Sequence, residues 1–221
     1  GATLQLSGVT IASEAITLIG GGHQGMGALH STGSSNLTGT VTVNNGTLQT
    51  ISVANGTLNI SGVLAGNNAS HWIKTGFGTG DISGTWDDAA NAPAYVHEGT
   101  LLLNKTDGNT AIAGALVIGD DSGDPQSDIV QLGNGNQIVN SVVTINSTGL
   151  LNLAGFTDTL ATTLNLRIGQ GTAAAIQTGG GTLVLAGNVN VEALAGADST
   201  VQISGNLDLG TTTRVGGVAN G

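Results

Sequence analysis

Apolar and polar residues alternate along most of this chain in short runs, and glycine or asparagine usually follows each run. Such runs include 40–43 (TVTV), 142–145 (VVTI), 163–168 (TLNLRI) and 189–194 (VNVEAL). A period of two places successive side chains on opposite faces of a strand, so each run predicts a half-buried β-strand. No window keeps apolar residues at i, i+3, i+4 and i+7 with charged residues between them, as an amphipathic helix requires. We therefore expect an all-β protein.

A glycine followed by a short strand phrase recurs through the chain. The phrase reads GATLQL from Gly1, GTLQTI from Gly46, GTLNIS from Gly56, GTLLLN from Gly99, GLLNLA from Gly149 and GTLVLA from Gly181. Recurrence of one strand unit is typical of solenoids, in which each coil stacks on the one before it. With roughly 20–25 residues per coil, the sequence predicts a right-handed parallel β-helix that forms a single module over residues 1–221.

The composition separates this solenoid from an antiparallel sandwich, which would show the same alternation. Aromatic residues make up 2% of the chain, whereas 38 of its 221 residues are glycine. A sandwich usually fills the gap between its sheets with large side chains. In a narrow coil, ladders of small inward residues about 4.8 Å apart fill the core without aromatic rings, which favours the β-helix.

Charge narrows the partners that this chain can have. The formal net charge is −10, with 4 lysines and arginines, and there is no cysteine. Nucleic acids and anionic membrane surfaces are bound by clustered cations, so neither partner is expected. The sequence contains no run of 18 apolar residues, so no membrane-spanning helix is predicted. Without cysteine, thiolate metal sites and cysteine catalysis are excluded.

One stretch of the chain resembles a known repeat. Lys74–Thr79 (KTGFGT), Ile82–Gly84 (ISG), the pair Thr85 and Trp86, and residues 96–103 (VHEGTLLL) follow one another in the order of the autotransporter-associated β-strand repeat. This family is also called the passenger-associated transport repeat. The block Leu116–Phe156 resembles the segment that commonly follows it in very large surface proteins.

The resemblance implies a β-helical passenger or stalk that a bacterium exports and either displays on its surface or releases. In that family the repeat serves folding and length, so no catalytic residue is implied, and the location would be extracellular or on the bacterial cell surface. The chain departs from the pattern at Gly80, where the family usually carries a core leucine. A glycine inside a strand often marks a bulge, so we expect a bulged or loosened rung there.

Three functional hypotheses follow. The first is a structural module of a bacterial surface fibre or stalk, whose open solenoid ends stack head to tail on further copies or on neighbouring repeats of the same chain. The alternative is an adhesin module that binds an extracellular glycan or a partner protein through its loops. A remote alternative is a polysaccharide-degrading β-helix enzyme. The cations Lys74, Lys105, Arg167 and Arg214 are each isolated in sequence from a carboxylate pair, so we expect no enzyme.

The most acidic segment of the sequence is a candidate calcium site. It contains Asp120, Asp121, Asp124 and Asp128 among turn-forming residues. Closely spaced carboxylates are the hard oxygen ligands that Ca²⁺ prefers. The segment lacks the glutamate at the twelfth position of an EF-hand loop, and acidic turns are also common on solvated surfaces. Two interpretations of this segment therefore stay open, a calcium-binding loop and an ordinary exposed loop. No other cofactor is predicted.

A second candidate site gathers aromatic and acidic residues near the middle of the chain. Its members are Trp86, Asp87, Asp88 and Tyr95, and His97 and Glu98 follow closely. Sugar sites combine an exposed aromatic ring with polar neighbours, so this group predicts a glycan or other ligand. The alternative is structural, because the family repeat tends to carry an aromatic residue at the position of Trp86, where the ring covers a turn.

Overall fold

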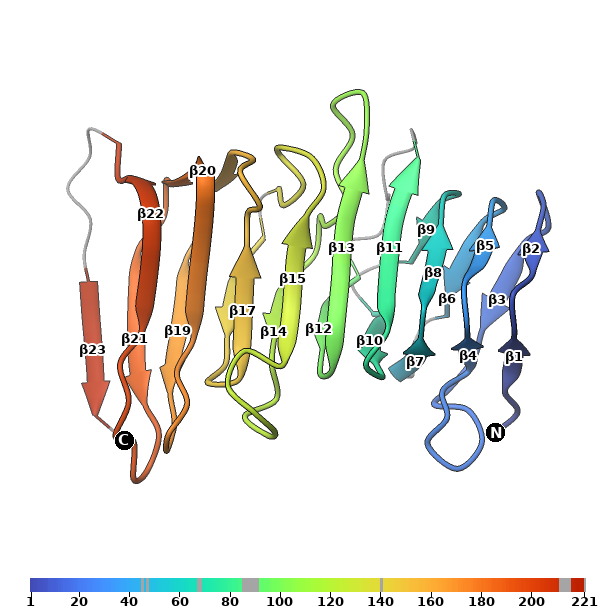
Figure 1. Cartoon of the computed structure of the whole chain (residues 1–221), viewed down its shortest axis with the longest axis horizontal. Helices are drawn as coiled ribbons and strands as arrows, with labels where there is room; N and C mark the ends of the chain where they lie inside the picture. The colour runs from blue at the N-terminus through green and yellow to red at the C-terminus, as the bar shows by residue number, and fades with distance from the viewer. Residues whose placement is uncertain are drawn as a thin grey trace.

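The chain winds into a parallel β-solenoid with about 23 residues per turn. The computed structural model describes residues 1–44, 46, 48–66, 69–84, 92–139 and 141–210, together with the backbone of 216–220. All regular elements in these residues are strands, and Figure 1 shows the coils following one another along the long axis, from the N-terminus at the right to the C-terminal end at the left. The predicted all-β fold and β-helix are confirmed. The described residues contain no helix long and apolar enough to cross a membrane.

The strands form parallel sheets that run along the sides of the coil. Sheet 1 contains β1 (Leu4–Leu6), β4 (Leu29–Thr32), β7 (Leu48–Asn55), β10 (His71–Thr75), β12 (Ala94–Val96), β14 (Leu116–Ile118), β16 (Val143–Ile145), β19 (Leu164–Ile168), β21 (Val189–Ala193) and β23 (Gly216–Asn220). Sheet 2 contains β2 (Thr10–Ile11), β5 (Ser35–Leu37), β8 (Thr57–Ile60), β11 (Thr79–Gly84), β13 (Gly99–Lys105), β15 (Asp128–Leu132), β17 (Gly149–Asn152), β20 (Ala175–Leu185) and β22 (Gln202–Asp208). Sheet 3 contains β3 (Ile16–Leu18), β6 (Val41–Val43) and β9 (Leu64–Ala65), and β18 (Asp158–Leu160) pairs with the second half of β20.

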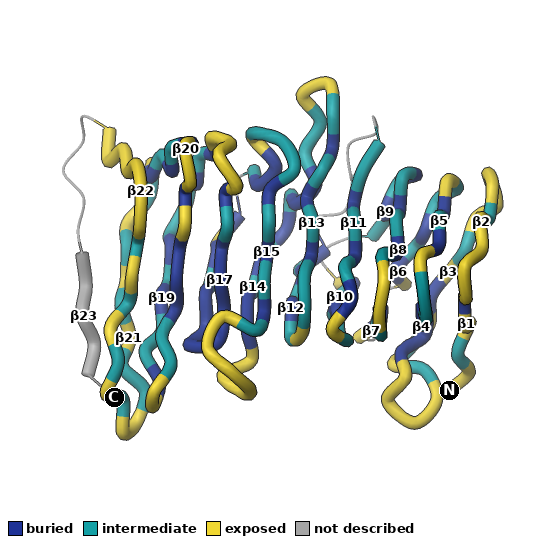
Figure 2. The backbone as a smooth tube through the Cα atoms, in the orientation of Figure 1, coloured by how far each residue is buried: buried dark blue, intermediate teal, exposed yellow. Residues whose placement is uncertain are grey.

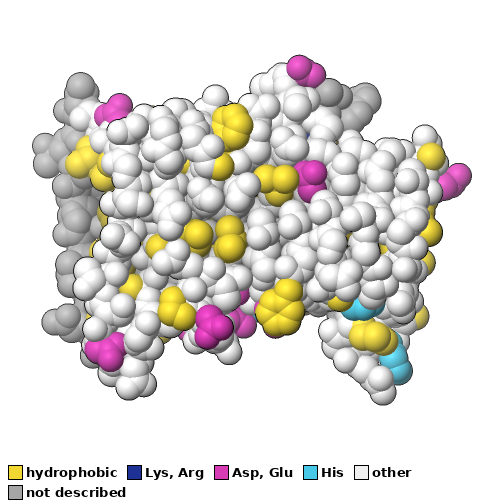
Figure 3. Space-filling view, viewed as in Figure 1, with side chains coloured by type: hydrophobic (Ala, Val, Ile, Leu, Met, Phe, Trp, Pro, Cys, Tyr) yellow, Lys and Arg dark blue, Asp and Glu magenta, His cyan; other side chains and the backbone are white. Residues whose placement is uncertain are grey.

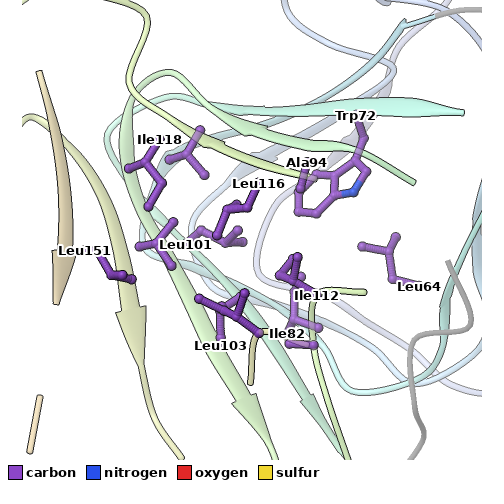
Figure 4. Close-up of a cluster of buried hydrophobic side chains, with 14 of the residues drawn as sticks. Leu64, Trp72, Ile82, Ala94, Leu101, Leu103, Ile112, Leu116, Ile118 and Leu151 are labelled. Atoms are coloured by element: carbon purple, nitrogen blue, oxygen red, sulfur yellow. The ribbon is translucent and has the colours of Figure 1, made fainter. Parts of the chain in front are cut away.

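Side chains of equivalent positions stack into ladders inside the coil. In sheet 2, for example, the paired inward positions are Leu58, Gly80, Leu101, Val130 and Leu151. Figure 2 shows buried residues along the strands of the central coils, and exposed residues at the loops and along β22. Figure 4 shows how Leu and Ile side chains from different coils meet in the interior, where they fill a thin core as the sequence predicts.

The largest inward side chain fits because its neighbours in the ladder are not large aromatics. Trp72 is buried on β10 and pairs with Gln49 in one neighbouring coil and with Ala94 in the other. Figure 4 shows its ring close to Ala94 inside the core. A core of this thickness therefore holds an indole ring where the next coil contributes only a methyl group.

The repeated strand phrase does not mark one position of the coil. The phrases from Gly1 and Gly46 lead into sheet 1, those from Gly56, Gly99 and Gly149 lead into sheet 2, and the one from Gly181 forms the second half of β20. The phrases from Gly46 and Gly56 even lie within one turn of about 23 residues. The phrase therefore signals the start of a strand after a corner, whichever sheet that strand joins.

The expected bulge at Gly80 is not present, and this prediction is wrong. β11 pairs with β8 and with β13 without a shift of register, and Gly80 lies opposite Leu58 and Leu101. A Cβ atom added at Gly80 would lie 3.6 Å from Cγ of Lys74 and 3.7 Å from Cδ1 of Leu101. The aliphatic part of the Lys74 side chain therefore lies beside Gly80, in space that a leucine at this position would need.

Close coil contact also restricts the corner inside β20. A Cβ atom added at Gly181 would lie 1.8 Å from the carbonyl oxygen of Phe156 in the preceding coil, whereas one added at Gly180 meets no atom within 4 Å. Gly181→Ala is therefore expected to lower the free energy of unfolding by about 3 kcal/mol, because the backbone of one coil must move away from the other. Gly180→Ala is the matched control, with an expected change within about 0.5 kcal/mol. Urea unfolding followed by circular dichroism measures both, and equal effects would contradict the close contact.

Candidate functional site

The corner between sheets 1 and 2 places one aromatic ring in solvent. The turn between β10 and β11 reads Gly76, Phe77, Gly78, and the Phe77 side chain is 82% exposed. Gly76 has a φ of 78°, and a Cβ atom there would lie 2.4 Å from the carbonyl oxygen of Val53. The Gly78 N–H donates to that same oxygen at 2.8 Å. The two glycines thus hold the turn tightly against the preceding coil, and Phe77 projects outward.

A buried lysine lies beneath this turn. Lys74 is 1% exposed, and its Nζ donates hydrogen bonds to the carbonyl oxygens of Gly78 and Glu98, each at 2.6 Å, and to that of Gly76. Burial lowers the pKa of Lys74 to about 8, against the opposing effect of the carboxylates of Glu98 and Asp128. This ammonium links the turn to the next coil, which gives the K-x-G-x-G pattern of the sequence a physical role.

Two adjoining cavities of about 460 and 290 Å³ open at this corner, and we call them together the corner groove. The larger cavity is lined by Gly25, Ser52, Ala54, Thr75, Gly76, Phe77, His97, Glu98 and Asp120. The smaller one is lined by Phe77, His97, Glu98, Asp120, Ser122, Gly123, Asp124, Ser127 and Asp128. Two loops, one between β3 and β4 and one between β14 and β15, project from the lower edge in Figure 1. Figure 3 shows the surface receding between these two protrusions.

Two aspartates of the predicted calcium site bind neighbouring groups of other coils. Asp121 accepts a hydrogen bond from the Ser147 N–H at 2.7 Å and lies 3.5 Å from Nη1 of Arg167. Asp128 is buried and accepts a hydrogen bond of 2.5 Å from the Thr148 hydroxyl group. Burial raises the pKa of Asp128, although the hydrogen bonds from Thr148 and Ser127 act in the opposite direction.

The other two aspartates stay at the surface. Asp120 is exposed, accepts a hydrogen bond from the Ser122 N–H at 2.9 Å, and places its Oδ2 3.8 Å from Nδ1 of His97. Asp124 is exposed at the rim of the smaller cavity. Within the described part of the chain, no three histidine or acidic side chains form a group that could hold a metal ion. Calcium binding by this loop stays a prediction without a converged set of ligands.

The second predicted site is described only in part. Trp86, Asp87 and Asp88 lie outside the described residues. Tyr95 is half-buried on β12, and its ring centroid is 6.3 Å from that of His71 and 6.3 Å from that of His97. Because His97 lines the corner groove, coil stacking brings the neighbourhood of Tyr95 next to the acidic loop. In the sequence these two regions are separate candidate sites.

Phe77 is a functional candidate that the sequence pattern did not single out, because it stands there only as part of the resemblance. An apolar ring between two glycines in a turn is nevertheless a signal of outward placement. His97 and Glu98 are assigned there to the Trp86 group, whereas the structure places them in the groove with Asp120. The groove therefore combines residues from five successive coils, from the loop before β4 to the loop after β14.

Comparisons with known proteins give no indication of function, so a functional interpretation depends on the structure of the groove. No protein family model matches this chain, and no curated protein or solved structure matches it. What the corner groove offers chemically is an exposed aromatic face, three surface carboxylates and an imidazole. Such a set can hold a ligand by stacking, hydrogen bonds and charge.

Proposed function

We propose that this chain is a structural module of an extracellular bacterial surface fibre or stalk, in which coils continue to stack along the solenoid axis. The observation that carries the proposal is the exposed apolar face of the first coil. Leu4 is 42% exposed, whereas the residues that follow it in the same ladder, Leu29 and Ile51, are 0% and 3% exposed. A further coil stacked on this face would bury Leu4 in the same way.

Other apolar side chains share this face. Ile19 is 64% exposed, and it lines an open apolar hollow of about 580 Å³ together with residues that include Leu4, Ile16 and Leu18. Contiguous exposed apolar surface usually marks an interaction site. The proposed fibre covers this face with further coils, supplied by a second copy or by additional repeats of the same chain.

The surface ladders support a mechanical role. On sheet 1, Nδ2 of Asn165 donates to Oγ1 of Thr144 at 3.3 Å, and Nδ2 of Asn190 donates to Oδ1 of Asn165 at 3.0 Å. Arg167 links Glu192 in the next coil, at 3.0 Å, to Asp121. Backbone and side-chain hydrogen bonds therefore both run along the rod axis, where they resist separation of the coils.

The location in this proposal rests on the resemblance of Lys74–Phe156 to the autotransporter-associated repeat and on the absence of cysteine. The strict parallel stacking of coils is compatible with that family. The alternative function, an adhesin module that binds a glycan or a partner protein, is favoured by one specific observation, the corner groove beside Phe77.

Electron microscopy of the purified chain tests the fibre proposal. We expect filaments that lengthen with protein concentration and repeat at roughly 45 Å, the length of about nine strand spacings of 4.8 Å. Ile19→Lys is expected to shorten them, because it places a charge on the first coil face, while Phe77→Lys, which adds the same charge at a corner, leaves their length unchanged. Isolated short rods at all concentrations would contradict stacking between copies and favour the adhesin alternative.

A further inference from the structure

We propose that the corner groove binds a basic peptide segment of a partner protein, with an arginine or lysine side chain over Phe77 and between the groove carboxylates. This inference goes beyond a structural role, because a stalk needs no groove. It is carried by the exposed ring, by the carboxylate residues that two successive coils contribute to the lining, and by the absence of a lysine or arginine among the described lining residues.

Glu98 and Asp120 stand at equivalent positions of successive coils, counted from the paired strands β12 and β14. Each follows a registered residue by two positions, since Glu98 comes two residues after Val96, which pairs with Ile118, and Asp120 comes two residues after Ile118. Successive coils are about 4.8 Å apart, and like charges placed side by side on neighbouring strands destabilise each other. A cation bound in the groove would offset the negative charge that these two groups bring to it.

The existing contacts balance only part of this negative charge. The ammonium of Lys74 lies below the groove, where it acts electrostatically on the Glu98 carboxylate but donates its hydrogen bonds to three carbonyl oxygens. Glu98 accepts only a backbone hydrogen bond, from the Gly76 N–H at 2.8 Å, and Asp120 has His97 at 3.8 Å. Asp124 adds a third surface carboxylate at the rim. No described lysine or arginine lines either cavity.

The type of cation follows from the lining. The described acidic and histidine side chains form no group of three that could hold a metal ion, so the groove does not resemble a calcium site. An aromatic face beside carboxylates instead suits a guanidinium or ammonium group, which stacks on the ring and pairs with the carboxylates. Phe77 supplies that face, with 82% of its surface accessible.

The described cations of this chain point to another protein as the proposed occupant. Lys74 and Lys105 are buried, and Arg167 is paired with Asp121 and Glu192, so a second copy offers no free side chain from these three cations. Four strand spacings of sheet 1 separate β4 from β14, so the two bordering loops lie about 19 Å apart. That span accommodates an extended peptide of about five residues.

Fluorescence anisotropy tests this proposal with a labelled peptide Gly-Arg-Gly-Arg-Gly, and with the same peptide carrying neutral citrulline in place of arginine. We expect the arginine peptide to bind at least tenfold more tightly than the citrulline peptide, with an affinity that falls as salt increases. Glu98→Gln/Asp120→Asn is expected to weaken binding at least tenfold, and Phe77→Ala about threefold.

A second double variant separates a site from general attraction to an acidic protein. Glu14→Gln/Asp107→Asn removes one Glu and one Asp charge at exposed positions outside the groove, and binding is expected to stay within twofold of the unmodified chain. Equal weakening in the two double variants would overturn the proposal, as would equal affinity for both peptides or no binding of the arginine peptide. Binding of neutral cello-oligosaccharides that is lost in Phe77→Ala but kept in Glu98→Gln/Asp120→Asn would assign the groove to a glycan instead. Thermal melts confirm that each variant is folded.

Discussion

The double variant Lys74→Ala/Gly80→Leu is expected to be more stable than the sum of its two single substitutions predicts. Gly80→Leu alone forces a leucine into space beside the Lys74 side chain, whose Cγ would lie 3.6 Å from the new Cβ, and overpacking of this kind costs about 2–3 kcal/mol. Lys74→Ala alone leaves a cavity and the carbonyl groups of Gly76, Gly78 and Glu98 without their donor, for a loss of about 3 kcal/mol.

Together, the two changes let the leucine fill the volume that the lysine chain vacates, between Leu58 and Leu101 of the same ladder. We expect a coupling free energy of about 2 kcal/mol or more, measured by urea unfolding of all four proteins. Gly80→Ala is the control, since its Cβ atom meets only ordinary contacts and should change stability by less than about 0.5 kcal/mol. Additive effects of the two substitutions would show that Lys74 and Gly80 do not share this space.

A second large effect concerns the pH dependence of stability and depends on Asp158. This residue is 1% exposed, and its Oδ2 accepts hydrogen bonds from the N–H groups of Gln137 at 2.7 Å and Ile138 at 3.3 Å. Burial raises the pKa of Asp158 to about 6 from 3.8, although those hydrogen bonds act in the opposite direction. The folded chain therefore binds this proton more tightly than the unfolded chain does.

The stabilisation from this proton is complete below pH 3.8 and is lost as the pH rises through 6. A shift of this size corresponds to about 3 kcal/mol. In Asp158→Asn, the difference in unfolding free energy between pH 4 and pH 7 is therefore expected to change by about 3 kcal/mol relative to the unmodified chain, because the amide does not titrate.

Asp107→Asn serves as the control, because Asp107 is an exposed turn residue, and its pH profile is expected to match that of the unmodified chain. Burial also raises the pKa values of Asp81 and Asp128, but both groups are present in every protein compared, so the difference isolates Asp158. Identical pH profiles for Asp158→Asn and the unmodified chain would mean that the buried carboxyl group titrates as it does in water.

Alternation of apolar and polar residues was sufficient to locate strands. The runs from 40–43, 142–145, 163–168 and 189–194 contain β6, β16, β19 and β21, because a period of two is a local property that needs no knowledge of neighbours. The scarcity of aromatic residues likewise indicated a thin core of stacked small side chains, and the inward ladders have that form. Strand positions and the solenoid class were therefore available from the residues alone.

The contacts that a single residue makes with neighbouring coils could not be predicted from the sequence pattern. Lys74 occupies an inward position between Ile51 and Val96, and no local pattern indicates that carbonyl groups from two coils surround its ammonium. The same limit explains the wrong prediction at Gly80. A glycine without a side chain predicts a loosened strand. At Gly80, however, the side chain of Lys74 from the facing sheet fills the space beside the glycine.

The corner groove on the surface likewise depends on coil stacking, which the sequence pattern does not predict. Phe77, Glu98 and Asp120 are about one turn apart in sequence, and the repeated glycine phrase, which joins different sheets, does not reveal their alignment. Periodicity depends on the residue and its near neighbours, so it specifies strands and a stacked architecture. The number of residues per coil varies along the chain, so only the stacked coils determine which residues some 22 positions apart become neighbours. The tertiary structure therefore decides where charge, an aromatic ring and a hollow coincide.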